Sequence, residues 1–172
     1  MIFVSGVHGV GKTYFCSMVK KELNINTYSA SELISKKGRK KLSVDKRTSE
    51  INQNQLYLQQ AVNELNKIDK KYILDGHFCL LDSDGNISKI PREVFFILKP
   101  DLIVLLKEKS SVIAARIWQR DGVVEDENKI SIFQKEEHLY AKEIANQLGI
   151  DIIVSQGNED LKKIIEKIRE EV

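Results

Sequence analysis

Hydrophobic residues follow two patterns along the chain: short segments of strand-like character, and longer stretches in which apolar side chains recur every three or four residues. The first pattern predicts strands buried in a sheet, and the second predicts helices with one apolar face. Strands are predicted at residues 2–5, 26–29, 72–75, 101–106 and 150–154. Helices are predicted at residues 12–23, 29–35, 48–67, 91–98, 110–120 with Ser110 as the cap, 129–148 after a polar loop at residues 121–128, and 159–171.

Strands that alternate with helices indicate an α/β fold with a mostly parallel sheet covered by helices on both faces. No repeat, low-complexity segment or Gly/Ser-rich linker interrupts the pattern, so residues 1–172 are predicted to form a single domain. Residues 80–90 depart from the alternation and predict a hairpin that turns at Asp84-Gly85. Ligands of such folds bind at the carboxyl ends of the strands.

Composition narrows the possible functions only slightly. The 172 residues are 42% hydrophobic and 30% charged, with a net charge of +2, so nothing global favours nucleic acid or an anionic membrane as a partner. Cys16 and Cys79 are far apart and form no C-x-x-C pair, which suggests reduced thiols and a cytoplasmic location. The apolar runs are too short to span a bilayer. The oligomeric state is not predicted.

The segment between the first strand and the first helix matches the phosphate-binding loop (P-loop) pattern, with the sequence GVHGVGKT at residues 6–13. Glycines let such a loop curl so that its N–H groups point at a polyphosphate, and the following helix adds the positive end of its dipole. Lys12 is then expected to reach the β- and γ-phosphates, and Thr13 to hold Mg²⁺. ATP and Mg²⁺ are the predicted cofactors. The residues expected to contact ATP here are Gly6, His8 (through its backbone N–H), Gly9, Val10, Gly11, Lys12, Thr13 and Tyr14.

A second group of polar residues follows the strand at residues 72–75, which ends in Asp75-Gly76-His77. P-loop enzymes hold the magnesium shell with a carboxylate at the tip of a neighbouring strand, and this role is predicted for Asp75. His77 is a candidate substrate-binding residue that could contact the phosphoryl acceptor or order a water. An acceptor phosphate is already ionised at neutral pH and needs no base, whereas a hydroxyl acceptor would need His77 or a nearby Asp.

Arg116 and Arg120 are four residues apart near the end of a predicted helix, so both side chains leave the same face. A phosphoryl group in transfer spreads negative charge over its oxygens, which two guanidinium groups would stabilise. Both are therefore predicted to be catalytic, together with Lys12 and Asp75. The alternative is a solvent-facing pair in which Arg120 forms a salt bridge with Asp121 or Glu125.

The densest basic run of the chain, KKGRKK at residues 36–41, has two interpretations. It is either a solvated loop or part of a mobile lobe whose cations help to hold an anionic acceptor. Two tetrapeptides, NKID at residues 66–69 and DSDG at residues 82–85, are spelled like GTPase motifs. They occur in the reverse of the order found in GTPases, so GTP recognition is not predicted.

These parts, in this order, resemble the adenylate-kinase-like branch of the P-loop kinases, in particular the archaeal-type adenylate kinases. The resemblance covers nearly the whole chain. It is carried by the P-loop, residues 45–47, Asp75-Gly76-His77 with the hairpin that follows, residues 99–101, Arg116, Arg120-Asp121 and the terminal strand, loop and helix. Gly76 stands where that family has Thr, and the lid is shorter, with fewer arginines.

The resemblance implies a five-stranded sheet in the order 2-3-1-4-5, counted along the chain. It also implies a short acceptor-binding lobe at residues 29–66, with Arg47 near the acceptor phosphate, and a lid at residues 116–128. The loop at residues 155–158, with Gly157, would lie against the adenine of ATP.

The predicted function is ATP- and Mg²⁺-dependent phosphoryl transfer to a small acceptor, most simply a nucleoside monophosphate. One alternative is a switch or assembly factor that hydrolyses ATP slowly and acts by binding a partner. Another is a kinase of RNA or DNA 5′ ends, for which residues 36–41 are the only local support.

Overall fold

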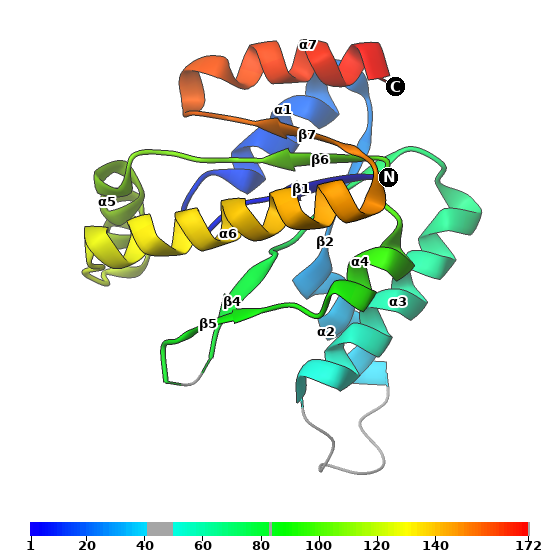
Figure 1. The fold of residues 1–172 in the computed structure, drawn as a ribbon. Coiled ribbons are helices and arrows are strands. Elements are labelled where there is room, and N and C mark those ends of the chain that lie inside the picture. Colours follow the sequence, from blue (N-terminus) through cyan, green and yellow to red (C-terminus); the bar gives the residue numbers. More distant parts are fainter. Residues whose placement is uncertain (41–49, 83, 172) are drawn as a thin grey trace.

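A computed structural model describes residues 1–40, 50–82 and 84–171 (Figure 1). Its centre is a parallel sheet of five strands in the order β2-β3-β1-β6-β7. The strands are β1 (Ile2–Ser5), β2 (Asn26–Ser29), β3 (Tyr72–Asp75), β6 (Leu102–Leu105) and β7 (Asp151–Val154). Counted among sheet strands, this is the predicted order 2-3-1-4-5, so the predicted fold class is confirmed.

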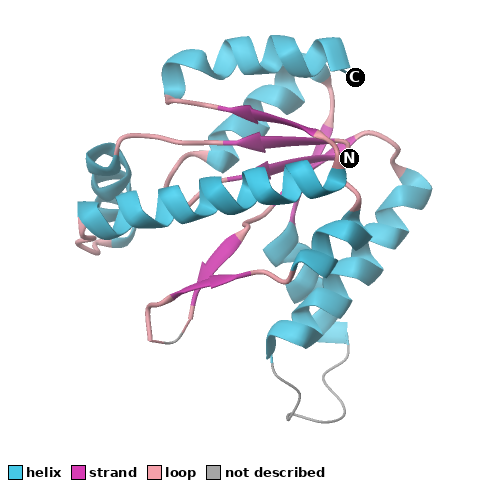
Figure 2. Cartoon of the chain, viewed as in Figure 1, coloured by secondary structure: helices cyan, strands magenta, loops and turns pink. Residues whose placement is uncertain are grey.

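Helices cover both faces of the sheet, as the alternating pattern predicted (Figure 2). The α-helices in the described residues are α1 (Lys12–Leu23), α2 (Ala30–Lys40), α3 (Glu50–Ile68), α4 (Arg92–Leu98), α5 (Ser110–Asp121), α6 (Glu127–Leu148) and α7 (Leu161–Glu171). Between α3 and α4, β4 (Cys79–Leu81) and β5 (Ile87–Lys89) pair antiparallel and form the predicted hairpin.

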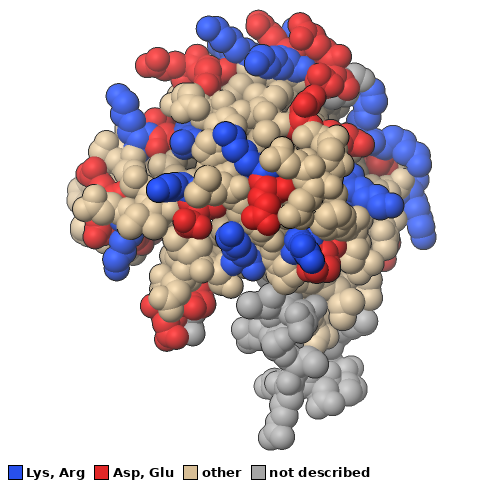
Figure 3. All heavy atoms as spheres, in the orientation of Figure 1, with Lys and Arg blue, Asp and Glu red and all other residues tan. Residues whose placement is uncertain are grey.

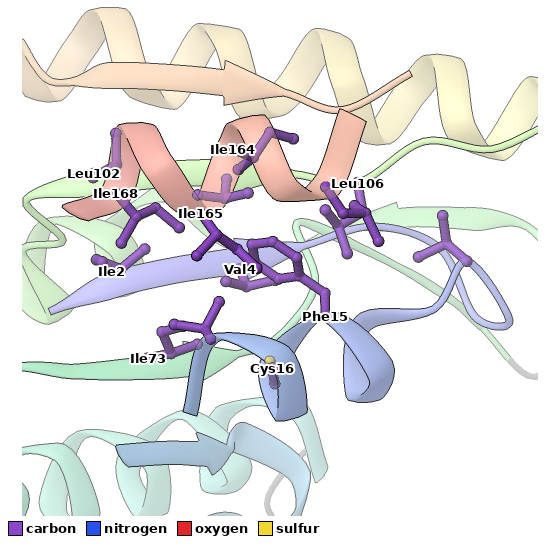
Figure 4. Packing of buried hydrophobic residues seen from close by; sticks show 14 of the residues in the cluster. Ile2, Val4, Phe15, Cys16, Ile73, Leu102, Leu106, Ile164, Ile165 and Ile168 are labelled. Atoms are coloured by element: carbon purple, nitrogen blue, oxygen red, sulfur yellow. The ribbon is translucent and has the colours of Figure 1, made fainter. Parts of the chain in front are cut away.

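Alternate residues of the strands face two separate cores. Ile2 and Val4 of β1 join the core beneath α1 and α7, where Phe15 and Ile165 are fully buried (Figure 4). Phe3 points the other way, into a core shared with α3, α4 and α6. Every residue of β1 and β6 is buried, which explains why the sequence of these strands is apolar with almost no interruption.

The opposite core contains an aromatic cluster at the foot of the hairpin. Phe78 stacks on Phe95 with ring centroids 4.6 Å apart, and Phe3 meets Phe78 edge to face at 5.2 Å. Tyr140 of α6 completes the cluster and donates a hydrogen bond from its hydroxyl to the carbonyl of Ile90. This packing fixes the chain that leaves β3 through Asp75-Gly76-His77.

The second helix is longer than predicted. The prediction ended it at Ser35 and gave residues 36–41 as a solvated loop or part of a mobile lobe, but α2 continues through Lys40. Lys36 pairs with Glu32 one turn earlier, and Lys37 pairs with Glu64 of α3. Favourable pairs of this kind, together with packing of α2 on α3, offset the low helix propensity of Gly38. Lys41 lies outside the described residues.

Several helix starts also differ from the predictions. Ser110, the predicted cap, is the first residue of α5, and Lys109 is the N-cap, which makes no side-chain capping bond. The long helix α6 begins at Glu127, inside the predicted polar loop. The last helix is preceded by a short 3-10 turn (Asn158–Asp160), so α7 begins at Leu161. None of these differences moves a predicted site residue.

The face seen in Figure 3 carries both basic and acidic side chains, separated by uncharged surface. This fits the small net charge of the chain. Within the part of the chain that the structure describes, no helix has the length and apolar character needed to cross a membrane.

Candidate nucleotide site

A cleft of about 1240 Å³ lies between the P-loop and the helices α2, α3 and α4. It brings together most of the predicted site residues. Those that line it are His8, Gly9, Gly11, Lys12, Thr13, Tyr14, Asp75, His77, Arg116 and Arg120. Gly6, Val10 and Gly157 are not part of this lining. Arg47 lies outside the described residues.

Gly6, the first residue of the P-loop, could be replaced by another residue only if the neighbouring backbone moved. Gly6 has φ +147°, and a Cβ atom built there would lie 2.6 Å from the carbonyl oxygen of Leu106. The two strands are this close because the N–H of Leu106 donates to the carbonyl of Ser5 at 2.8 Å. The sequence pattern therefore reflects a real steric requirement at the point where β1 enters the loop.

Lys12 is folded back onto its own loop. Its Nζ donates to the carbonyl oxygens of Gly6 (2.7 Å) and Val7 (3.4 Å) and lies 3.0 Å from Nε2 of His77. The side chain is buried, and burial lowers its pKa although the carboxylates of Asp75 and Glu137 act in the opposite direction. The ammonium group is thus held inside the site by polar contacts that phosphate oxygens could replace.

His77 is neutral in this arrangement. Burial lowers its pKa to about 3, and the nearby Lys12 ammonium adds to the effect. An ammonium group can only donate, so Nε2 of His77 accepts the bond from Lys12 and the ring proton is on Nδ1. A histidine with so low a pKa is a poor general base at neutral pH.

Asp75 ends β3 directly beside the strand that leads into the P-loop, in register with Val4. Its carboxylate is half-buried, and burial raises its pKa while Lys12 lowers it. The next residue, Gly76, donates its N–H to the carbonyl of Val4 at 3.0 Å. A Cβ atom at position 76 would lie 2.7 Å from Cζ of Phe3, so the Thr of the resembled family does not fit here.

Both arginines lie on α5, and each forms hydrogen bonds to other groups of this chain. Arg116 donates from Nη1 to the carbonyl of Val10 (2.8 Å) and from Nη2 to Glu108 Oε2 (3.3 Å). Arg120 pairs with Asp121 at 2.6 Å, the alternative considered from the sequence, and also contacts His8 in the P-loop. Arg116 is fixed by the loop itself, whereas Arg120 is exposed, and its pair with Asp121 is weak enough to exchange.

Gly157 lies behind Glu108 rather than in the cleft lining. A Cβ atom at this position would lie 3.3 Å from Glu108 Oε1. Glu108 follows β6 and pairs with Arg116, which donates to the carbonyl of Val10 in the P-loop. The predicted contact of Gly157 with adenine stays a prediction.

Three buried polar residues outside the cleft lining were not predicted from the sequence: Ser5, Gln134 and Glu137. A signal was present, because residues 130, 134, 137, 141 and 144 follow the buried face of α6. A carboxylate at position 137 thus stands where an apolar side chain is expected.

The far half of the cleft has mixed chemistry. Polar groups come from Ser31 and Ser35 of α2 and from Asn54 of α3. Apolar surface comes from Ile34 and Val94. This half can accommodate a small molecule that has both a hydrogen-bonding edge and an apolar face.

Comparisons with known proteins agree with this picture. A family model described as an AAA domain matches residues 5–132. A cytidylate kinase from Sulfolobus acidocaldarius is 31% identical over 155 residues, which cover 88% of this chain and 78% of that protein. These findings support a family similar to nucleoside monophosphate kinases and do not support the narrower resemblance to archaeal-type adenylate kinases.

Solved structures share the fold at low sequence identity. A gluconokinase from Sinorhizobium meliloti 1021 has a TM-score of 0.53 and 14% identity, and the match covers 96% of this chain and 86% of that one. The protein TT1252 from Thermus thermophilus has a TM-score of 0.58 and 10% identity, with 99% and 96% covered. The chain therefore belongs to the AAA domain family matched over residues 5–132, as a P-loop protein with a kinase-like fold.

Proposed function

We propose that this protein transfers the γ-phosphoryl group of ATP, bound with Mg²⁺, to a nucleoside monophosphate. The single observation that carries this function is the continuous cleft. Lys12, Asp75 and Arg116 line one end of it, and the other end extends between α2, α3 and α4. Such a site can hold a triphosphate and a small acceptor in contact. The cytidylate kinase relative makes CMP the first acceptor to test.

On the donor side, Lys12 exchanges the carbonyls of Gly6 and Val7 for β- and γ-phosphate oxygens. Arg116 and Arg120 stabilise the charge that spreads over the transferred group. Arg120 gives up its exposed pair with Asp121 for phosphate oxygens, which requires only a side-chain rotation. Arg116 keeps its place beside the loop.

The residues present suit Mg²⁺. Thr13 and Asp75 offer a hydroxyl and a carboxylate, the hard oxygen ligands that this ion prefers. Among residues 1–40, 50–82 and 84–171, no group of three His, Cys, Asp or Glu side chains could hold a metal alone. This fits an ion held mainly through substrate phosphates and one or two protein oxygens. When bound, Mg²⁺ supplies neutralisation of the β- and γ-oxygens.

The state of His77 favours an acceptor that arrives ionised. With its pKa near 3 and its Nε2 engaged by Lys12, His77 cannot efficiently remove a proton from a hydroxyl group. A phosphate oxygen needs no such base. We therefore favour a nucleoside monophosphate over a sugar alcohol, and place His77 near the acceptor as an orienting group.

Residues 29–66 are proposed to bind the acceptor, and residues 116–128 to act as the lid. Ser31, Ser35 and Asn54 would meet polar edges of the acceptor, and Val94 would meet its apolar face. Arg47 remains the predicted partner of the acceptor phosphate, outside the described residues.

The test is a transfer screen with γ-³²P-labelled ATP against nucleoside monophosphates, nucleosides and sugars. We expect labelled product with CMP or another monophosphate, loss of labelling in Lys12→Ala, and full labelling in Lys20→Ala. Lys20 is an exposed lysine of the same helix and serves as the matched control. Labelling of a sugar alone would refute a monophosphate acceptor.

Two other outcomes point to the other candidate functions. ATP hydrolysis that needs a macromolecular partner, with no labelled small product, would favour a switch or assembly factor. Labelling of oligonucleotide 5′ ends, with binding that weakens steeply as salt increases, would favour a nucleic-acid kinase.

A further inference from the structure

The inward face of α6 carries two polar residues within one turn, between apolar neighbours. Gln134 is 6% exposed and Glu137 is 1% exposed, while Ile130, Ala141 and Ile144 complete the same face. Neither polar residue faces solvent, and neither lines the cleft. Both form hydrogen bonds to backbone groups of other segments.

Glu137 connects the exits of two strands. Its Oε1 accepts from the hydroxyl of Ser5 and from the N–H of Phe78 (2.9 Å), and its Oε2 accepts from the N–H of Cys79 (2.6 Å). Ser5 is the last residue of β1, directly before the P-loop, and Phe78 directly follows His77. One carboxylate therefore links the segment that carries Lys12 to the segment that carries Asp75 and His77.

Gln134 holds a third segment. Its Oε1 accepts from the N–H of Glu108 (3.0 Å), and its Nε2 donates to the carbonyl of Glu108 (2.8 Å). Glu108 in turn binds Arg116, which donates to the carbonyl of Val10 in the P-loop. The backbone at Glu108 is thus fixed at two points, and the arginine is oriented through it.

The carboxylate at position 137 is buried, and burial raises its pKa even though three donors and the Lys12 charge act to lower it. An apolar side chain in its place would leave the hydroxyl of Ser5 and the N–H groups of Phe78 and Cys79 without this acceptor, which costs stability. The same three bonds hold two strand exits together. A positioning role must therefore be read from kcat and from the geometry of the site, and not from stability.

We infer that Glu137 and Gln134 are positioning residues of the phosphoryl-transfer site, which set the P-loop, the Asp75–His77 segment and Arg116 in register from a single helix. This rests on the proposed function and deepens it. Glu137 keeps Nε2 of His77 and Nζ of Lys12 within contact distance. Gln134 keeps Arg116 against the P-loop. Neither residue touches the substrate.

The test compares Glu137→Gln with Glu136→Gln, a neighbouring change of the same kind that breaks none of these bonds. A glutamine at position 137 must present its NH₂ group to at least one of the three donors and carries no charge, so the link is weakened with almost no change in volume. We expect kcat to fall by roughly 10²-fold in Glu137→Gln while the KM for ATP changes by less than about threefold, because misplaced groups slow the reaction more than they weaken binding. Glu136→Gln should behave as wild type.

A second readout does not need an acceptor. The contact between the ring of His77 and the side chain of Lys12 is followed by NMR at pH 7, as a nuclear Overhauser effect between their protons. In wild type and Glu136→Gln this effect should be present, because Nε2 of His77 lies 3.0 Å from Nζ of Lys12. In Glu137→Gln it should be weakened or lost, because the two strand exits are no longer held in register. If wild type transfers no phosphate, the proposed function fails, and this readout still decides the positioning role of Glu137.

Two further variants separate the role of Glu137 from that of Gln134. Gln134→Met should lower kcat without changing the contact between His77 and Lys12. Ser5→Ala removes one of the three donors and replaces Glu137→Gln if that variant does not fold; it should weaken the contact between His77 and Lys12 in the same way. An unchanged contact in folded Glu137→Gln or Ser5→Ala would overturn the role of Glu137. An unchanged kcat in Gln134→Met would overturn that of Gln134.

Discussion

Mild acid should destabilise this protein through His77. The folded state lowers the pKa of His77 from 6.5 to about 3, mainly by burial and then through the Lys12 charge. In the unfolded chain the imidazole binds a proton near pH 6.5, whereas in the folded chain it does not. The contribution of neutral His77 to the free energy of unfolding is therefore complete above pH 6.5, and it is lost progressively as the pH falls from 6.5 toward 3.

The size of the loss follows from these two pKa values. Each pKa unit corresponds to about 1.36 kcal/mol. Between pH 7 and pH 5, protonation of the unfolded chain at His77 should lower the free energy of unfolding by about 2 kcal/mol, because the folded state binds almost no proton there. This is a large fraction of the roughly 5–15 kcal/mol that stabilises an ordinary domain.

The assay is urea unfolding of wild type and His77→Gln at pH 5, 6, 7 and 8. Glutamine keeps an oxygen that can accept from Lys12 but does not titrate. Asp75 and Glu137 have raised pKa values and act in the opposite direction, since their contributions are lost as the pH rises. His138, whose pKa is lowered, acts in the same direction as His77. All three are present in both proteins, so the difference between the two curves isolates His77.

We expect wild type to lose about 2 kcal/mol more than His77→Gln between pH 7 and pH 5. Equal losses in the two proteins would refute the burial and charge argument for His77. A smaller loss in wild type would mean that His77 is charged in the folded state.

Other changes test the donor side and the core. Lys12→Ala should lower kcat by at least about 10²-fold, because a cation is removed from the phosphate oxygens, and circular dichroism should show an unchanged fold. Arg116→Lys should also lower kcat, because an ammonium group cannot bind the Val10 carbonyl and Glu108 in the fork geometry of a guanidinium; the KM for ATP should change less. Ile165→Ala should reduce the free energy of unfolding by about 2–5 kcal/mol in urea titrations, since the side chain is fully buried between α7 and the sheet.

The strands and the P-loop were predictable because they depend on local signals, whereas the order of the strands was implied by the resemblance to a known family. Buried strands such as β1 and β6 are apolar throughout, and the P-loop needs glycine and lysine at fixed spacing. The arginine pair was predictable because four residues make one helical turn. Each of these signals lies within a short window of the sequence.

The features that were missed depend on tertiary contacts. The extension of α2 through Lys40 is supported by the pair between Lys37 and Glu64 of another helix, which no local pattern reveals. Glu137 makes its bonds to segments 58 and 132 residues away. Its position on an apolar helix face was visible in the sequence, but its partners were not.

The close approach of Phe3 and Gly76 limits which pairs of residues can occupy these two positions in homologous proteins. A side chain at position 76 would occupy the space of the Phe3 ring, so the two positions share one volume. A threonine introduced at position 76 requires a smaller residue at position 3, and neither change is favourable alone: the first overpacks the core and the second leaves a cavity. The two positions should therefore vary together among homologues. A chimaera that takes its first strand from one relative and residues 72–76 from another should fold well only when the residues at positions 3 and 76 fit together.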